Sequence, residues 1–139
     1  MNVKTEIKQR LLEVYLMNRM SIVIWGRKFE LDVVYKTFSN KGVTELQCEA
    51  ADKFCEKEEF NDSLEQIKGY VLENGGSENG VKEIENIFKY VMPKSIYVPK
   101  ASERIVAILC DYRFDPEHGI AIVYKNETFG YIDEEGAVI

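Results

Sequence analysis

The sequence predicts a single α+β domain with a mainly antiparallel sheet, a C-terminal β-meander and about four helices packed on it. Strand-like segments near the N-terminus are followed by amphipathic helical segments and then by apolar runs, an order typical of this class. The chain has 139 residues, of which 45% are hydrophobic and 12% aromatic, enough for one core. We therefore interpret residues 1–139 as one globular domain.

The N-terminal part predicts a helix followed by a β-hairpin. Apolar side chains recur at helical spacing over residues 3–17, within a segment 1–19 whose attachment to the core the sequence leaves open. Residues 21–25 and 29–35 have the composition and alternation of strands. The pair Gly26-Arg27 between them has the length of a tight turn, so we expect a hairpin here.

Two capping-box patterns mark the starts of the next two helices. Thr44 precedes Gln47, and Ser63 precedes Gln66, in each case at the spacing that lets the hydroxyl and the amide satisfy free backbone N–H groups. Apolar residues continue at helical spacing after both starts. The second helix is predicted to end at Asn74-Gly75, because glycine favours the left-handed conformation that closes helices.

The segment that follows predicts a loop, a helix and a minor strand. Residues 75–80 are rich in glycine, which indicates a flexible loop in solvent. Residues 81–91 carry apolar side chains at helical spacing, and Pro93 should end that helix. Residues 96–98 lie between Pro93 and Pro99, so they predict a short or edge strand.

The C-terminal third predicts a buried meander. Residues 105–109 and 120–124 are continuous apolar runs, which favour central strands covered on both faces. Residues 128–132 predict a third strand. Residues 133–136 then form a turn that leads into 137–139.

Charge and cysteine content narrow the classes of partner. Eighteen Lys and Arg face 24 Asp and Glu, a net charge of −6, and no basic cluster could track a phosphate backbone, so we expect no nucleic-acid partner. The net negative charge would favour a basic protein as the partner, although net charge is first of all an argument about solubility. No apolar run is long enough to span a membrane, and charged residues interrupt the N-terminus, so we expect a cytoplasmic protein with reduced cysteines.

The turn around the single histidine holds the candidate functional side chains. Pro116 and Gly119 supply turn geometry, and the Asp115 carboxylate can accept a backbone N–H. Glu117 and His118 are left without a structural explanation. We expect the bend to project the imidazole outward, where it serves the turn or recognises a partner.

Cysteine chemistry and metal binding are disfavoured by spacing. If Cys110 pairs opposite Val123, its sulfur lies roughly 13 Å from the turn, too far from His118 for a nucleophile and base pair. Cys48 and Cys55 lie about 10.5 Å apart along one predicted helix, too far to share a zinc ion. We therefore expect no metal and no cofactor.

Asp111 is an acid whose surroundings the sequence leaves open. Strand alternation allows it to be exposed at an edge, paired with Arg113 or Arg104, or desolvated with a raised pKa. An enzyme, either a hydrolase or metal-dependent, would use His118 with Asp111, Asp115 or Glu117. Such an enzyme would need a pocket that a hairpin tip open on all sides does not supply.

Three segments carry a resemblance to a group of proteins. They are Asp-Pro-Glu-His-Gly-Ile-Ala-Ile-Val over 115–123, Ile-Trp-Gly-Arg-Lys-Phe-Glu-Leu over 24–31, and Thr-Glu-Leu-Gln-x-Glu-Ala-x-x-x-Phe over 44–54. Over residues 20–139 the chain resembles small uncharacterised bacterial domains, some of which are similar to immunity proteins of polymorphic toxin systems. The resemblance implies binding and blocking of a toxin, and it supplies no catalytic residue. The tail 129–139 also resembles one unit of tryptophan-glycine repeat proteins, which implies a strand-turn-strand ending.

The favoured hypothesis is a non-enzymatic protein-binding domain. Its candidate contacts for a basic partner are acidic or titratable side chains of the two C-terminal turns, namely Asp115, Glu117, His118 and Glu134, with Asp133 and Glu135 beside them. The alternative is the enzyme centred on His118. A third hypothesis is assembly through an exposed strand edge at 96–98 or 137–139, and the oligomeric state stays open.

Overall fold

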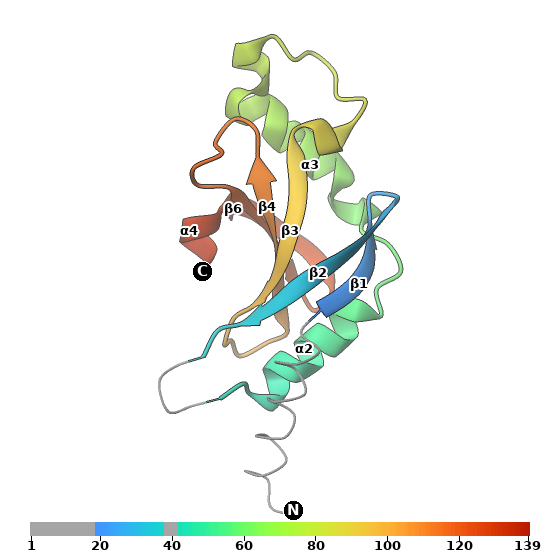
Figure 1. The fold of residues 1–139 in the computed structure, drawn as a ribbon, viewed down its shortest axis with the longest axis vertical. Helices are drawn as coiled ribbons and strands as arrows, with labels where there is room; N and C mark the ends of the chain where they lie inside the picture. Colours follow the sequence, from blue (N-terminus) through green and yellow to red (C-terminus); the bar gives the residue numbers. More distant parts are fainter. Residues whose placement is uncertain (1–18, 38–41) are drawn as a thin grey trace, which may run out of the picture.

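Six strands form one sheet, in the order in which they occur along the chain (Figure 1). The computed structural model describes residues 19–37 and 42–139, so the helix predicted over 3–17 lies outside the described residues. Every neighbouring pair is antiparallel except β2 and β3, which are parallel. The prediction of an α+β domain with a mainly antiparallel sheet is therefore confirmed. The strands are β1 (Arg19–Ile24), β2 (Arg27–Tyr35), β3 (Val91–Val98), β4 (Ile105–Tyr112), β5 (Ile120–Lys125) and β6 (Thr128–Glu134).

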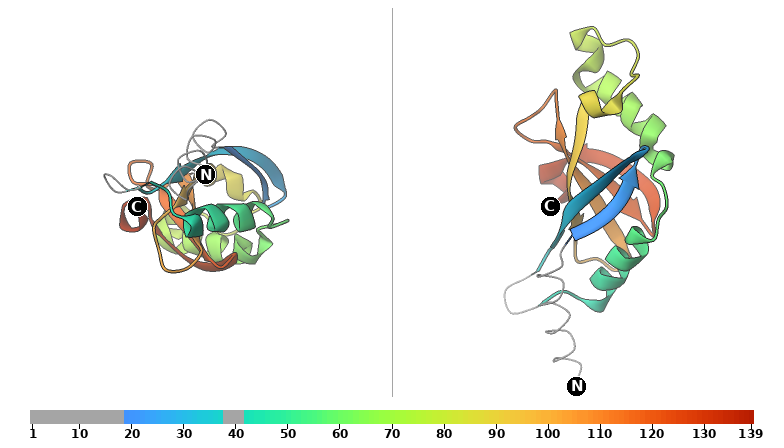
Figure 2. Two further views of the ribbon diagram at one scale, coloured as in Figure 1. Left: turned by 90° about the horizontal axis from the view of Figure 1, so that it is seen from below. Right: turned by 45° about the vertical axis from the view of Figure 1, so that its right-hand side comes forward.

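The described residues contain three α-helices, so the predicted number of about four is wrong for this part of the chain. These are α2 (Glu45–Cys55), α3 (Leu64–Val71) and the single turn α4 (Glu135–Val138). The first two lie within the long crossover between the parallel strands β2 and β3. The sheet curves around them (Figure 2), and their apolar side chains enter the main core.

The helix predicted over residues 81–91 is absent. Only a 3₁₀ turn at Ile87–Lys89 forms, and β3 already begins at Val91. Asn86 is extended and its side chain accepts a hydrogen bond from the Phe88 N–H, which starts this short turn. Ile84 and Ile87 are buried nevertheless, because an irregular segment can also place every third residue against a core.

The capping box of α2 is confirmed. Thr44 Oγ1 accepts the Gln47 N–H at 3.1 Å, and the Thr44 N–H donates to Gln47 Oε1 at 2.8 Å. Gln47 is 2% exposed, and its Nε2 also donates to the carbonyls of Lys36 and Val98 at 2.8 and 3.0 Å. The cap therefore also attaches the start of the helix to the ends of β2 and β3.

The second predicted capping box is wrong, because Ser63 has a different partner set. Its hydroxyl donates to the Phe60 carbonyl at 2.8 Å and accepts from Trp25 Nε1 at 3.0 Å and from the Tyr124 hydroxyl at 2.7 Å. The side chain is fully buried, so this hydroxyl connects the first hairpin, the helical layer and β5. The predicted hairpin β1–β2 is confirmed, but its turn is Trp25-Gly26, one residue earlier than expected.

The prediction of a short or edge strand at residues 96–98 is wrong. β3 has eight residues and lies between β2 and β4. Proline has no backbone N–H to donate to a neighbouring strand. Pro93 is tolerated in β3 because the register with β4 shifts between Pro93 and Ser95, and the missing donor costs little at such an irregularity. Residues 96–98 are central, which leaves no free edge there for assembly.

The apolar strands β4 and β5 are buried on both faces, as predicted. One face meets the main core, and the other meets a smaller cluster of Tyr97, Ala107, Leu109, Ala121 and Val123. The meander formed by β4, β5 and β6 is present, but the register predicted from Cys110 opposite Val123 is wrong. Cys110 pairs with Ile120, because the connection is wider than a tight hairpin.

The predicted strand-turn-strand ending is also wrong. Residues 135–138 form α4, and its last N–H, on Ile139, donates to the Glu135 carbonyl. Figure 1 shows this turn beside β6. Residues 137–139 therefore provide no strand edge for assembly.

Candidate functional site

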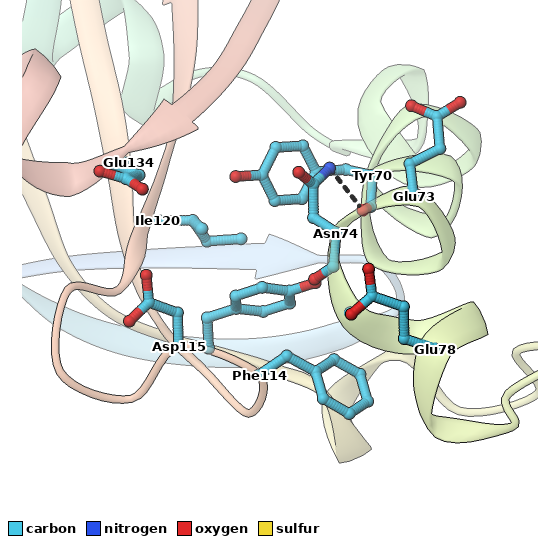
Figure 3. Close-up of a pocket in the computed structure, with 10 residues that line it drawn as sticks. Tyr70, Glu73, Asn74, Glu78, Phe114, Asp115, Ile120 and Glu134 are labelled. Carbon is cyan, nitrogen blue, oxygen red and sulfur yellow. Dashed lines mark hydrogen bonds between the residues drawn. The ribbon is translucent and has the colours of Figure 1, made fainter.

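A hollow of about 360 Å³ lies between the end of α3, the β4–β5 connection and the end of β6 (Figure 3). We call it the acidic hollow. Its lining residues are Tyr70, Glu73, Asn74, Gly75, Glu78, Tyr112, Phe114, Asp115, Ile120 and Glu134.

One wall of the acidic hollow is fixed by a contact between β4 and the segment after α3. The Tyr112 hydroxyl donates to the Asn74 carbonyl at 2.6 Å, and the Asn74 amide donates back to the Tyr70 carbonyl at 2.9 Å. Gly75 has φ of 114°, and a Cβ there would lie 2.6 Å from the Cβ of Phe114. Glycine is therefore required at this position both for its backbone conformation and for the approach of Phe114.

Carboxylates dominate the electrostatics of the hollow. Four of its lining side chains are acidic, from three separate parts of the chain, and no Lys or Arg is among them: Glu73, Glu78, Asp115 and Glu134. The pKa of Tyr70 is raised by partial burial and then by the charges of Asp133, Glu134 and Asp115. The pKa of Tyr112 is raised to about 12, first by burial and then by Tyr70 and Asp115. The hollow thus disfavours additional negative charge.

The histidine turn borders the acidic hollow without placing the imidazole in its lining. His118 Nδ1 lies 2.9 Å from Asp115 Oδ1, and the His118 backbone N–H donates to the same oxygen at 3.3 Å. Gly119 has φ of 68°, so the predicted turn roles of Asp115 and Gly119 are confirmed. The imidazole is 60% exposed and projects outward, as expected. Its pKa is raised by the hydrogen bond and charge of Asp115, with smaller contributions from Glu117 and Glu134.

Two of the four predicted binding residues, Asp115 and Glu134, line the acidic hollow, whereas Glu117 and His118 are exposed outside its lining. Glu135, expected to be a free contact, pairs with Lys94 at 3.0 Å. Its backbone N–H also donates to the Gly119 carbonyl at 3.3 Å. Glu135 therefore attaches the end of β6 to the histidine turn.

The other candidate groups are separated from one another. Cys110 is fully buried, its Sγ contacts the Ile108 carbonyl at 3.7 Å, and burial raises the pKa of its thiol. No hydrogen bond joins Cys110 to His118 in the described residues. Asp111 is exposed, which is one of the three settings that the sequence left open, and its Oδ1 lies 3.6 Å from Nζ of Lys94. Its ion-pair partner is therefore Lys94 and neither of the two arginines that the sequence offered. Within residues 19–37 and 42–139, no group of three His, Cys, Asp or Glu side chains is placed to hold a metal ion.

Sequence reasoning missed the α3 side of the acidic hollow. Tyr70, Glu73 and Glu78 belong to a helix end and a glycine-rich segment that was expected to be a solvent loop. Only the start of the segment is packed: Gly75 approaches Phe114 and Gly76 is buried, whereas residues 77–80 are exposed, as expected of a solvent loop. The backbone of Asn74 and Gly75 is non-helical, so the helical path is interrupted where the helix end was predicted. The adjacent glycines were the only signal of this close packing, and they do not identify Phe114 as the neighbour.

Comparisons with known proteins identify a family but no activity. No curated protein and no solved structure matches the chain. None of the helices that the structure describes combines the length and the apolar character needed to cross a bilayer. A family model matches residues 4–138, nearly the whole chain, and the protein therefore belongs to the family described as Domain of unknown function (DUF6985).

Proposed function

We propose that this protein is a non-enzymatic protein-binding domain that accepts a basic side chain of its partner in the acidic hollow. The observation that carries the proposal is the lining of one concavity, which contains four acidic residues and three aromatic residues and no Lys or Arg. A guanidinium group pairs with carboxylates through planar hydrogen bonds and also stacks on aromatic faces. Arginine is therefore the side chain that this lining fits best, with lysine as a weaker substitute.

The exposed residues of the histidine turn extend the proposed interface. Glu117 is exposed, and His118 is held by Asp115 at the rim of the hollow. Glu117 adds a negative charge beside that of Glu134, and negative charge facing a basic partner raises the association rate more than the affinity. The resemblance to immunity proteins supports a finer form of the proposal: neutralisation of a basic toxin in a bacterial cytoplasm.

The alternative, a hydrolase or metal-dependent enzyme centred on His118, has less support. Catalysis needs convergent groups around a substrate, in a site that limits solvent. The imidazole of His118 is open to solvent, and its Nδ1 is engaged by Asp115. These observations favour a surface that binds over a site that reacts.

A titration with N-acetyl-arginine amide, followed by backbone amide NMR, tests the proposal. We expect saturable shifts around Tyr70 and Phe114. The double variant Glu78→Gln/Glu134→Gln should weaken binding about threefold or more at low salt, since each exposed charge pair contributes up to about 1 kcal/mol. A matched control is Glu30→Gln/Glu58→Gln, which removes two exposed carboxylates elsewhere. Equal affinity in both double variants would contradict the proposal.

Once a protein partner is in hand, association kinetics provide a second test. The variant Glu117→Lys/Glu134→Lys should slow association at low salt, and the difference should shrink as salt screens the charges. The control is Glu30→Lys/Glu58→Lys, which makes the same change of net charge on other parts of the chain. An association rate that both variants lower equally would show only a net-charge effect and would exclude this surface.

A further inference from the structure

A second hollow lies on the other side of Phe114. It has a volume of about 470 Å³, and its lining contains two cations and no carboxylate: Asn79, Val81, Lys89, Tyr90, Arg113 and Phe114. We call it the basic hollow. Phe114 lines both hollows, so the two are neighbours.

A row of aromatic rings runs from the acidic hollow to the basic hollow, and Phe114 is the ring that both share. Tyr70 packs on Tyr112 at a centroid distance of 5.8 Å, Tyr112 on Phe114 at 5.9 Å, and Phe114 stacks on Tyr90 at 5.7 Å. Two contacts at the C-terminal end of β4 hold the row: the Tyr112 hydroxyl donates to the Asn74 carbonyl, and the backbone N–H of Arg113 donates to the Tyr90 carbonyl at 2.8 Å. Phe114 is thus a fixed divider between opposite charges.

The cations of the basic hollow are available to a ligand. Lys89 Nζ and Arg113 Cζ lie 5.8 and 6.0 Å from the centroid of the Tyr90 ring, on a shared aromatic platform. No ion pair joins either cation to a carboxylate of the described residues, although Glu83 and Glu85 line an adjacent hollow that also borders Lys89. Lys89 and Arg113 can both donate charge-assisted hydrogen bonds, and a carboxylate is an anionic group that can accept from both.

We propose that the basic hollow binds a carboxylate side chain of the same partner whose basic side chain occupies the acidic hollow. This inference rests on the proposed function and adds a second element of recognition: a partner segment that crosses Phe114 with one cation and one anion in a fixed order. Such a pair would distinguish the partner from other basic proteins, because a segment with two cations would place one of them against Lys89 and Arg113.

Blocked peptides that carry one arginine and one aspartate test this arrangement. The two residues are separated by up to about three glycines, which spans roughly 13 Å of extended chain. Each peptide is compared with its Asp→Asn and its Arg→Gln counterparts by fluorescence anisotropy at low salt. For at least one spacing, we expect the aspartate to tighten binding by about threefold or more.

Protein variants then test whether the tighter binding caused by the aspartate depends on the basic hollow. Lys89→Gln/Arg113→Gln should abolish the preference for aspartate over asparagine and leave the preference for arginine over glutamine. The control Lys28→Gln/Lys36→Gln removes two other exposed lysines and should keep both preferences. The inference is overturned if aspartate gives no gain at any spacing, or if the gain survives in Lys89→Gln/Arg113→Gln. If the unmodified protein bound the Arg→Gln peptides as tightly as the arginine peptides, the proposed function would be overturned instead.

Discussion

Replacing Gly75 with alanine perturbs the wall between the two hollows. A Cβ at this position would lie 2.6 Å from Cβ and 2.9 Å from Cγ of Phe114, so one of the two segments must move. The backbone has φ of 114°, a conformation that costs a residue with a side chain about 1–3 kcal/mol. Overpacking against a fixed ring adds about 1–3 kcal/mol. We therefore expect Gly75→Ala to lower the free energy of unfolding by about 2–6 kcal/mol.

Gly80→Ala is the matched control, because it separates the two contributions. Gly80 also has a positive φ, of 82°, but nothing lies within 4 Å of a Cβ built there. This variant should therefore lose only the backbone contribution of about 1–2 kcal/mol. Chemical denaturation of the three proteins under identical conditions measures both differences. If Gly75→Ala and Gly80→Ala had the same free energy of unfolding, Phe114 would not be packed against Gly75. The proposed wall between the two hollows would then be wrong.

Two further predictions concern the buried hydroxyl and the histidine turn. Ser63→Ala removes the oxygen that accepts hydrogen bonds from Trp25 and Tyr124 in the core. Chemical denaturation should therefore show a free energy of unfolding that is lower by about 2–4 kcal/mol. A decrease below about 1 kcal/mol would contradict the hydrogen-bond assignment. The pKa of His118 is raised by Asp115, so its contribution to stability is fully present below the unfolded pKa near 6.5 and is lost as pH rises through the folded pKa. Asp115→Asn should lower that pKa in an NMR titration, and an unchanged pKa would refute the pairing.

Local chemistry accounts for the parts of the fold that were predicted correctly. The β4 and β5 strands follow from continuous apolar runs, and α2 follows from Thr44 and Gln47, because each of these signals acts between residues that are close in sequence. The capping interpretation failed at Ser63, whose hydroxyl is used by Trp25 and Tyr124 instead. A local pattern gives no information on such distant partners.

In the candidate site too, residues marked by local sequence signals were predicted, and residues brought in by distant contacts were missed. Asp115 was recognised because a proline, a glycine and a histidine surround it in sequence, and Glu134 was identified from its position in an acidic turn. The opposite wall comes from residues about 40 positions earlier, joined to β4 by the Tyr112 hydroxyl bond to Asn74 across a separation of 38 residues. Neither periodicity nor composition reports a contact of this length. Periodicity also placed a helix over 81–91, where burial of every third residue required only an irregular segment.

The rigidity of the aromatic row bears on how the proposed interface would bind. Exposed charge pairs contribute little individually, so an open surface of this kind gains affinity mainly by avoiding the entropy cost of ordering its own side chains. Gly75, Tyr112 and Tyr90 hold Phe114 in place before any partner arrives. The carboxylates and cations on either side of it are therefore presented in a fixed spatial order. Selectivity between partners would then depend on the sequence of charges in the bound segment more than on its total charge.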